Sequence, residues 1–519
     1  MMTTQYQNPI RRGMYPDPSI VRVDDTYYMV NSTFEYYPGI ALAKSQDLLN
    51  WEQMPGVAKL PSQADLRTSK SNEGIFAVCI RYHKGSFYVI TTNFAEFKTF
   101  IIKGRFNDDH SAIIWNERRV EVNVPGIDPD LYFENNRTYV QFTGYIDDHG
   151  TKAIRQVEID LATGKILDGP KILTYGTGGR DVEGPHILKK DGKYYLIVAE
   201  GGTGQGHMVT IFKSDQLWGP YTDEPGVNPL FTNRDRAEEP LQNIGHADLF
   251  TDPQGNWWLT CLGTRPATVD FSQITNIGRE TLLYPVVWDG TWPRIYNGVP
   301  TLNVDLTDFP QHAATLTNAQ PDSSLTDDFR CGLCNEWLTL RDTLEQDLTL
   351  QAGQLTLHGR NQRLSDLGTP AFLGLRQAEQ EELLTIDLDA KQSQPAHGRY
   401  GLVTIINVDH FAGIMIQANP GGGYNVIRYQ QVADVVVNDV IGHLDAQPAQ
   451  LSIQSTKAKK IYTAANDEQT VSFTVAAINL SNEALAALNA GDIQGLYAEN
   501  DAQVKAVKVI RKPWLPTEE

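Results

Sequence analysis

The feature that most constrains the fold of this chain is a hairpin-like segment that recurs five times in the first 265 residues. In each copy a turn-forming polar pair is followed by aromatic and then aliphatic residues, a pattern typical of a β-hairpin. The leading aromatic residues are Tyr27, Phe87, Tyr139, Tyr194 and Trp257, at intervals of 60, 52, 55 and 63 residues. Each interval is long enough for a four-stranded antiparallel sheet, and helical patterns are almost absent from it. The repeat therefore predicts a five-bladed β-propeller.

The sequence changes character after about residue 305, as expected of a 519-residue chain, which exceeds the roughly 250–300 residues of a single core. Residues 306–326 are polar and rich in turn-forming residues, which predicts a linker. From Asp327 onward, apolar and polar residues alternate in short runs, a pattern typical of an antiparallel β-sandwich. Within that part, segment 481–490 is compatible with one short helix. We therefore predict an all-β chain with a five-bladed propeller over residues 1–305, a linker over 306–326 and a supporting antiparallel β-sandwich over 327–519.

Charge and cysteine content exclude several classes of protein. The formal net charge is −19, and no cluster of Lys and Arg offers the basic surface that nucleic acids require. The sequence has neither a run of about 18 apolar residues nor a signal-peptide core, so we expect no membrane association and a cytoplasmic protein. Cys331 and Cys334 form a CxxC pair, with no second pair or nearby His to complete a zinc site. The expected partner is a small neutral oligosaccharide, and we expect the chain to form a homo-oligomer.

The repeat also predicts which residues lie together. In each unit the strand before the turn is the inner one, and inner strands of a propeller converge on its axis. An Asp before Pro is most often a turn residue, but three carboxylates at one axis are costly to fold, so a structural role for all three is a weak explanation. Glycoside hydrolysis uses such a cluster, because it needs one protonated and one ionised carboxyl group. Counting back ten or eleven residues from each leading aromatic gives one position per blade: Asp17, Phe76, Asp128, Glu183 and His246.

Five short motifs at and near these positions resemble glycoside hydrolase family 43. The match in order and spacing runs from residue 8 to about residue 300, and the C-terminal part is similar to the β-sandwich of that family's β-xylosidase and α-L-arabinofuranosidase branches. The resemblance implies that Asp17 is the general base, Glu183 the general acid, and Asp128 the residue that positions Glu183 and favours its protonated form. It also implies inversion at the anomeric carbon. The motifs are YPDPS (15–19), IDPDL (127–131), VEGPH (182–186), GHADL (245–249) and NIGRE (276–280).

The same resemblance implies four substrate-binding residues. Arg279 matches an arginine that binds the terminal sugar, with a surface pair to Glu280 as the alternative. Phe34 matches an aromatic residue of the sugar pocket, with core packing as the alternative, and Phe76 stands where many relatives have Trp, which leaves the pocket shape open. His246 matches a position near a bound cation in several relatives, so it is a candidate for both substrate and metal binding. The chemistry requires no cofactor, and a structural calcium ion in the central channel is compatible with the sequence.

These residues predict an exo-acting inverting glycosidase. The stretch 80–93 looks closer to the arabinofuranosidase branch, so we predict release of terminal α-L-arabinofuranose from arabino- and arabinoxylo-oligosaccharides. A β-D-xylosidase acting on xylo-oligosaccharides, or an enzyme with both activities, is a close alternative, because the two pentoses present similar hydroxyl groups. Two alternatives are not enzymes: a sugar-binding propeller and a structural scaffold whose carboxylates hold a cation. A binding propeller would keep its aromatic residues and Arg279 without needing all three carboxylates.

Overall fold

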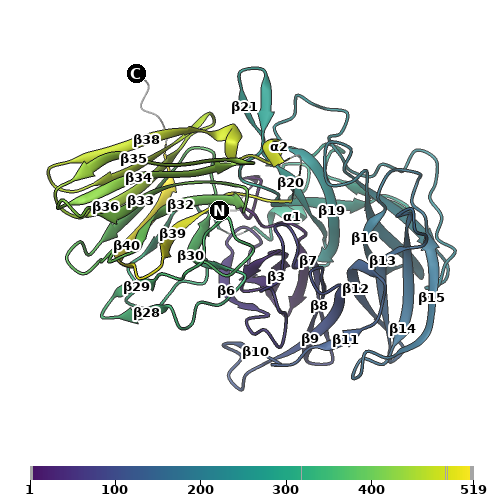
Figure 1. The fold of residues 1–519 in the computed structure, drawn as a ribbon. Helices are drawn as coiled ribbons and strands as arrows, with labels where there is room; N and C mark the ends of the chain where they lie inside the picture. Colours follow the sequence, from purple (N-terminus) through teal and green to yellow (C-terminus); the bar gives the residue numbers. More distant parts are fainter. Residues whose placement is uncertain (1–3, 317, 486, 488, 515–519) are drawn as a thin grey trace.

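Two β-domains lie side by side in the computed structural model, which describes residues 4–316, 318–485, 487 and 489–514 (Figure 1). The N-terminal domain contains five separate antiparallel sheets of three to five strands and two two-stranded ones, and the C-terminal domain contains two large sheets. Among the described residues, α-helix is confined to two single turns, Pro310–Ala313 (α1) and Asn482–Leu485 (α2). The predicted all-β fold, a five-bladed propeller followed by a sandwich, is confirmed. No helix in the described part of the chain is long and apolar enough to cross a bilayer.

Each propeller blade is an up-and-down sheet in which strands follow one another in chain order. The first strands of neighbouring blades contact each other around a closed ring, so they are the inner strands. Blade I contains β2 (Ser19–Val23), β3 (Thr26–Asn31), β5 (Ile40–Ser45) and β6 (Glu52–Val57); blade II β7 (Ile75–His83), β8 (Ser86–Asn93), β9 (Lys98–Phe106), β10 (Ile113–Trp115) and β11 (Val120–Val122); blade III β12 (Gly126–Glu134), β13 (Arg137–Tyr145), β14 (Lys152–Ile159) and β15 (Ile166–Thr174). Blade IV contains β16 (Glu183–Lys190), β17 (Lys193–Glu200) and β18 (Met208–Ser214); blade V β19 (Gln242–Thr251), β20 (Trp257–Thr264), β23 (Glu280–Trp288) and β24 (Pro293–Ile295), beside the separate hairpin of β21 (Ala267–Val269) and β22 (Ser272–Ile274).

The two ends of the propeller segment are tied together. Strand β1 (Gln5–Gln7) pairs with β25 (Asn303–Asp305), and the hydroxyl of Tyr6 donates to the carbonyl of Leu283 in blade V at 2.6 Å. The first part of the predicted linker packs on the propeller, because apolar side chains from it join the buried core of blade V. These side chains are Leu306, Phe309, Ala313 and Leu316. Residue 317 of the predicted linker lies outside the described residues.

The C-terminal domain is a sandwich of two eight-stranded sheets. Apolar side chains of the two sheets alternate inward and form one buried cluster, with Leu355, Ile386, Leu402 and Leu496 fully buried in it. One sheet contains β26 (Leu325–Asp327), β28 (Leu348–Gln351), β29 (Gln354–His358), β31 (Glu382–Leu388), β36 (Gln450–Ser455), β37 (Lys459–Ala465), β38 (Thr470–Ala476) and β40 (Gln503–Pro513). The other contains β27 (Leu338–Leu340), β30 (Ala371–Arg376), β32 (Arg399–Asn407), β33 (His410–Ala418), β34 (Tyr424–Val432), β35 (Val435–Leu444), β39 (Ile493–Glu499) and β4 (Tyr36–Tyr37).

The short helix predicted over 481–490 forms only in part. Its first turn is α2, which follows a 3-10 turn over Ala477–Leu480. Asn482 then holds the returning chain, because its side-chain amide donates to the carbonyl of Ala490 at 2.9 Å and its side-chain oxygen accepts from the N–H of Ala490. Residues 486 and 488 lie outside the described residues. This segment is therefore a compact loop that is tied at both ends.

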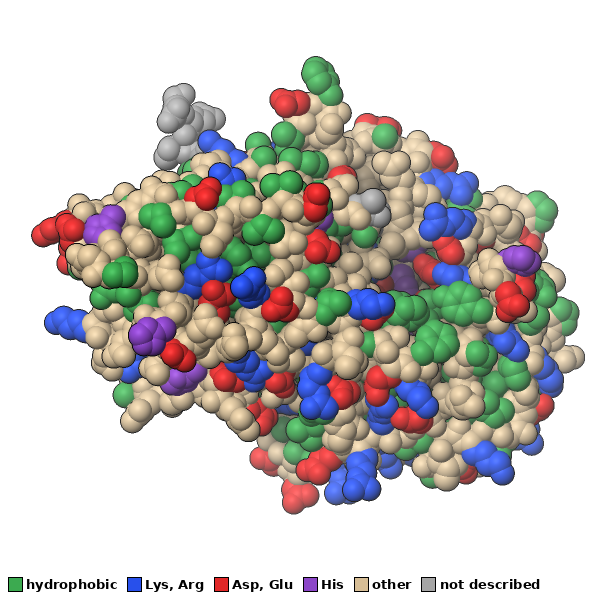
Figure 2. Space-filling view, in the orientation of Figure 1, with side chains coloured by type: hydrophobic (Ala, Val, Ile, Leu, Met, Phe, Trp, Pro, Cys, Tyr) green, Lys and Arg blue, Asp and Glu red, His purple; other side chains and the backbone are tan. Residues whose placement is uncertain are grey.

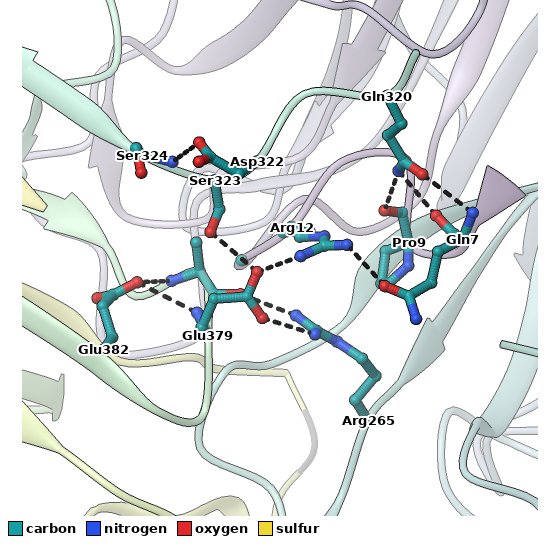
Figure 3. A network of polar contacts seen from close by, with 12 residues as sticks. Gln7, Pro9, Arg12, Arg265, Gln320, Asp322, Ser323, Ser324, Glu379 and Glu382 are labelled. Atoms are coloured by element: carbon teal, nitrogen blue, oxygen red, sulfur yellow. Dashed lines mark hydrogen bonds and ion pairs between the residues drawn. The ribbon is translucent and has the colours of Figure 1, made fainter. Parts of the chain in front are cut away.

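Strand pairing and ion pairs join the two domains. Strand β4, which leaves blade I, pairs with β27 and so belongs to a sandwich sheet. Figure 3 shows a second junction, in which Arg12 and Arg265 of the propeller both approach the carboxylate of Glu379 in the sandwich. Arg265 also donates to Glu280 at 2.6 and 2.8 Å. Because Glu280 follows Arg279 directly, this junction anchors the start of β23 and the residue before it.

Candidate active site

A cavity of about 300 Å³ lies where the inner strands of the propeller begin. Figure 2 shows a hollow in the propeller surface next to the sandwich, with histidine, acidic and basic side chains gathered at it. All seven side chains that the sequence singles out as catalytic or binding residues line the cavity. They are Asp17, Phe34, Phe76, Asp128, Glu183, His246 and Arg279.

The same β-bulge in four inner strands explains how side chains reach this cavity. In each of these strands the ladder skips two residues at this bulge, between Ile75 and Val78, Ile127 and Asp130, Glu183 and His186, and Gly245 and Asp248. The first skipped residue adopts a left-handed backbone in three of the four strands, with φ of 51° at Asp128, 61° at Gly184 and 47° at His246. A bulge of this kind bends the strand and redirects a side chain. Asp17, with φ of 52°, has the equivalent place, two residues before the ladder of β2.

The bulges correct one part of the sequence interpretation. Counting from the leading aromatics placed Glu183 at the position equivalent to Asp128, whereas the register places Gly184 there and Glu183 one residue earlier. The reason is steric, because a Cβ atom at Gly184 would lie only 2.9 Å from the ring of His246. A side chain cannot occupy the bulge position of blade IV without displacing that ring. The carboxylate of this blade is therefore supplied by the preceding residue.

Asp17 is surrounded by groups that stabilise its ionised form. Its Oδ1 accepts a hydrogen bond from Nη1 of Arg279 at 3.2 Å and lies 3.5 Å from Nδ1 of His246. Its Oδ2 accepts from the hydroxyl of Ser32. Burial raises the pKa of Asp17, but Arg279, His246 and the Ser32 hydrogen bond outweigh burial, so the pKa lies below its ordinary value. Asp17 is an ionised hydrogen-bond acceptor at neutral pH.

Asp128 has the opposite electrostatic environment. Burial raises its pKa well above the ordinary range, and the nearby carboxylates of Glu183 and Asp17 raise it further. The ammonium of Lys152 and the backbone N–H of Gly184 only partly offset these effects. Lys152 lies closer to Glu183, with Nζ 2.9 Å from Oε2. Asp128 therefore retains a proton beside Glu183, with which it forms a carboxyl pair, whereas Asp17 is ionised.

His246 is a neutral imidazole at the floor of the site. Burial lowers its pKa to about 4, although Asp17 partly opposes this effect. Burial likewise lowers the pKa of His207 to about 4, and Nδ1 of that ring lies 3.0 Å from the carbonyl oxygen of Asn243. Neither histidine adds a positive charge at neutral pH. His246 is thus a close polar neighbour of Asp17, with Nδ1 3.5 Å from Oδ1, rather than its counter-ion.

Aromatic rings form one wall of the cavity. The ring of Phe34 packs edge-on against Phe76 at 5.8 Å, and Phe76 stacks on Phe94 at 4.4 Å. Phe34 is only 4% exposed and also lines the cavity, so it is packed like a core residue, and its contact with a sugar stays a prediction. Flat apolar rings beside polar groups are the usual surface for a sugar face. Phe94 extends the wall and was not singled out by its motif.

Arg279 connects the carboxylates with the aromatic wall and is not the surface pair considered as its alternative. Its guanidinium is 6% exposed, lies 5.5 Å above the ring of Phe34 and donates to Thr203 at 3.2 Å. Its buried Nε has no partner in the described structure, so it is a free donor beside Asp17. The sandwich supports the loop that precedes Arg279, because the backbone N–H of Asp492 donates to the carbonyl of Asn276 at 2.8 Å.

A second polar layer lies directly beneath the first. Two residues deeper along their strands, Asp130 and Asp248 both pair with the guanidinium of Arg81 at 2.9 Å, and Nδ1 of His186 lies 3.1 Å from Asp130. The hydroxyl of Ser19 donates to Asp248 at 2.8 Å. All five blades contribute to this layer, and Arg81 is its central cation. Arg81 keeps the pKa of Asp130 low, at about 2, against the effect of burial.

The residues of the channel do not match a calcium site. Calcium takes roughly six to eight oxygen ligands, whereas Asp17, the carboxylate facing His246, is already bound by Arg279 and Ser32. Among the described residues, the one group of three close donors is Cys79, Asp130 and His186, and the guanidinium of Arg81 occupies it. We assign no chemical step to a metal. The predicted calcium ion stays a prediction that a chelator tests.

The cavity contains seven further polar or aromatic side chains that sequence reasoning missed. Phe94, Tyr145 and Lys152 come from strand ends of blades II and III, Arg180, Asp181 and Thr203 from loops beside blade IV, and Asn489 from the sandwich loop after α2. The sequence did carry a usable signal for Tyr145 and Lys152. These residues pair across the hairpin of β13 and β14, at the end of the blade where the inner strand begins. Asn489 carried none, because its place depends on how the domains dock.

The arrangement combines an ionised carboxylate with a proton-retaining carboxyl pair around a cavity for one small polar ligand, which suits acid–base cleavage of a sugar linkage.

Comparison with known proteins agrees with this chemistry. Residues 6–293 match Glycosyl hydrolases family 43, and residues 326–509 match the Beta xylosidase C-terminal Concanavalin A-like domain. The non-reducing end alpha-L-arabinofuranosidase of Bacteroides ovatus is 31% identical over 512 residues, which cover 96% of this chain and 92% of that protein. The beta-xylosidase of Bacillus subtilis is 30% identical over 392 residues, which cover 71% of each.

Solved structures give the same result over the whole length. The structure titled Bacteroides ovatus Xyloglucan PUL GH43B has a TM-score of 0.87 at 28% identity and covers 98% of this chain and 100% of its own. Xylan beta-1,4-xylosidase from Bacillus halodurans C-125 has a TM-score of 0.86 at 26% identity and covers 98% and 99%. The chain is therefore a glycoside hydrolase that belongs to family 43.

Proposed function

We propose that this enzyme is an exo-acting, inverting α-L-arabinofuranosidase that releases terminal α-L-arabinofuranose from arabino- and arabinoxylo-oligosaccharides. The observation that carries the proposal is the contrast between Asp17, whose pKa is lowered, and Asp128, whose pKa is raised, across one small cavity. At about 300 Å³ the cavity is at the small end of ligand pockets, which favours one terminal sugar over an internal stretch of a chain. The relative similar over 96% of the chain is named as an arabinofuranosidase, which supports the choice of sugar.

In the proposed mechanism Asp17 takes a proton from the attacking water. Arg279 keeps Asp17 ionised and lines the cavity, where its guanidinium can donate to a sugar hydroxyl. Glu183 protonates the leaving oxygen from the other side of the sugar, and Asp128 is the second carboxyl group of the pair, from which Glu183 can regain its proton. Water attacks from the side of Asp17, so the first product has the inverted anomeric configuration.

The rest of an oligosaccharide has room outside this cavity. A second cavity of about 580 Å³ adjoins the first and shares Arg180, Gly202, Thr203 and Asn489 with it. Its lining comes from blade IV, blade V and the sandwich loop and includes the polar residues Gln205, Gln242 and Asn243. This supports a substrate longer than one sugar.

The proposal is tested with the nitrophenyl glycosides of α-L-arabinofuranose and β-D-xylose. We expect the larger kcat/KM on the arabinofuranoside, and NMR of an oligosaccharide digest to show the inverted anomer first. Hydrolysis of neither substrate would remove the enzymatic proposal and favour a sugar-binding propeller. A retained anomer would mean that Asp17 attacks the sugar itself. The cytoplasmic location and the homo-oligomeric state stay predictions for cell fractionation and light scattering.

A β-D-xylosidase is the second candidate. Relatives named beta-xylosidase and xylosidase/arabinosidase match about 70% of this chain, and the sandwich matches a domain named for β-xylosidases. A kcat/KM on the xyloside above that on the arabinofuranoside would establish this candidate. Similar values on both substrates would establish an enzyme with both activities.

A further inference from the structure

Lys152 lies between two carboxylates at the edge of the active-site cavity. Its Nζ is 2.9 Å from Oε2 of Glu183 and 3.1 Å from Oδ1 of Asp181. The side chain is only 14% exposed, and it extends from the first residue of β14, which pairs with Tyr145 at the end of β13. One buried ammonium group thus bridges the proposed general acid and a second carboxylate that the mechanism does not use.

The charges around this lysine favour its protonated form. Burial alone would lower the pKa of Lys152, but the carboxylates of Glu183, Asp181 and Asp128 outweigh burial and raise the pKa. The pKa of Asp181 is lowered, because Arg180 and Lys152 outweigh its partial burial. Several charged and titratable groups face Glu183, Lys152 or Asp181. Besides these three residues themselves, they are Asp17, Asp128, Tyr145, Arg180 and His246.

In this arrangement the proton of the carboxyl pair lies on Asp128, and not on the proposed general acid Glu183. The ammonium of Lys152 donates to Oε2 of Glu183 at 2.9 Å, while burial and its carboxylate neighbours favour a proton on Asp128. A general acid needs the proton on Glu183. Something in the site must therefore allow the proton to pass from one carboxyl group to the other.

We propose that Lys152 is a positioning residue that controls which carboxyl group of the Asp128–Glu183 pair carries the proton, with Asp181 as its second partner. While the ammonium rests on Glu183, the proton stays on Asp128. When the ammonium moves fully to Asp181, the O–H bond at Asp128 breaks and one forms at Glu183, which then donates that proton to the leaving oxygen. The move is short, because both carboxylates are already within 3.1 Å of Nζ. This inference rests on the proposed glycosidase function.

The test is the alkaline limb of the pH profile of kcat/KM on the nitrophenyl arabinofuranoside and xyloside. Lys152→Met removes the positive charge beside Glu183, so the proton is held to higher pH and the limb moves up by about one pH unit. Asp181→Asn removes the second partner and leaves the ammonium on Glu183, so the limb moves down and kcat/KM at neutral pH falls about tenfold. Lys152→Arg keeps the charge and returns the limb close to its wild-type position.

Lys189→Met is the matched control. Lys189 pairs with Glu134 at 2.7 Å, outside the cavity lining, and its loss is expected to leave the limb in place. A purely structural role for Lys152 would lower kcat/KM in the Met and Asn variants without moving the limb. An unmoved limb, or shifts of the same sign in both variants, would overturn the proposal.

A second measurement does not depend on activity. Asp181 has a lowered pKa, so the stabilisation that it gains from Lys152 is present above its unfolded pKa of about 4 and is lost as the pH falls further. The melting temperature of Lys152→Met should therefore lie below that of the wild type at pH 7 and approach it below pH 4. A difference that does not change with pH would count against the bridge. If the wild type hydrolyses neither pentoside, the proposed function fails, while this measurement still tests the ion pair between Lys152 and Asp181.

Discussion

The two polar layers of the propeller channel contain the same kinds of residue but differ in how their charges are compensated. The upper layer holds Asp17, Asp128 and His246, and the lower layer, two residues deeper in the same strands, holds Asp130 and Asp248 with His186 and Ser19. In the lower layer one guanidinium, that of Arg81, bridges both carboxylates. In the upper layer Arg279 pairs with Asp17 alone, and Asp128 retains a proton.

The difference between the layers lies in what fills their centre. The lower layer is filled by a side chain of the protein, so its carboxylates are ionised, paired and unavailable. The upper layer surrounds a cavity, so its charges are only partly compensated until a ligand enters. Incomplete compensation separates the protonation states of the carboxyl groups, which acid–base catalysis requires. The lower layer should therefore be needed for stability and the upper layer for turnover.

The largest effect is expected from Asp17→Asn. The amide keeps the shape of the side chain but cannot take a proton from water, so kcat on both nitrophenyl pentosides should fall about 10⁴-fold. The melting temperature should fall by only a few degrees, because the amide oxygen can still accept a hydrogen bond from Arg279, which also keeps its bond to Thr203. Steady-state kinetics and thermal unfolding of the same preparation check both statements. A variant that melts early would show that the upper layer also holds the fold together.

Arg81→Met should give the opposite result. It leaves Asp130 and Asp248 buried without their cation, a loss of about 3–5 kcal/mol in the free energy of unfolding. The readout is urea-induced unfolding followed by tryptophan fluorescence. Arg137→Met is the control, because Arg137 pairs with Glu158 on the surface at 3.3 Å and its loss should not change the unfolding midpoint. Equal midpoints for the two variants would contradict a structural lower layer.

Acid pH should remove part of the difference between wild type and Arg81→Met. The pKa of Asp130 is lowered to about 2 in the folded protein, against about 3.9 in an unfolded chain. A lowered pKa stabilises the fold above pH 4, and the stabilisation is lost as the pH falls towards 2. Melting temperatures of the two proteins measured from pH 6 to pH 2.5 should therefore converge. Parallel curves would mean that Arg81 acts by packing alone.

Glu183→Gln is expected to give a smaller loss that depends on the substrate. A nitrophenolate leaves with little help from an acid, so kcat on nitrophenyl pentosides should fall by only about tenfold, against about 10²-fold on an oligosaccharide. Comparing kcat on both substrates for Glu183→Gln and Asp17→Asn separates the acid from the base. If the two variants lose the same activity on the nitrophenyl substrates, the roles assigned to the two residues are wrong.

The repeat in the sequence predicted the layers better than it predicted the details within them. Its period brings Asp17, Asp128 and His246 to one axis, because every blade repeats the same hairpin. It misplaced Glu183 by one residue, because the bulge position of blade IV must be glycine to make room for a ring from blade V. This steric conflict between Gly184 and His246 arises between strands about 60 residues apart, so it cannot be predicted from a local sequence pattern. Lys152 was missed for a similar reason, because its partners come from another blade.

The smallest effect should come from removing divalent cations. If Arg81 is the cation of the lower layer, dialysis against EDTA should leave kcat/KM within about twofold and the melting temperature unchanged, because the pairs with Asp130 and Asp248 are formed by the chain itself. A calcium ion bound near His246 would instead stabilise the folded state in proportion to its occupancy. Its removal would then lower the melting temperature, and adding calcium back would restore it.

The same treatment of Arg81→Met sharpens the comparison, because loss of the guanidinium exposes the donors of Cys79, Asp130 and His186 to one another. Stabilisation of that variant, but not of the wild type, by an added divalent cation would show that the arginine holds the place of an ion.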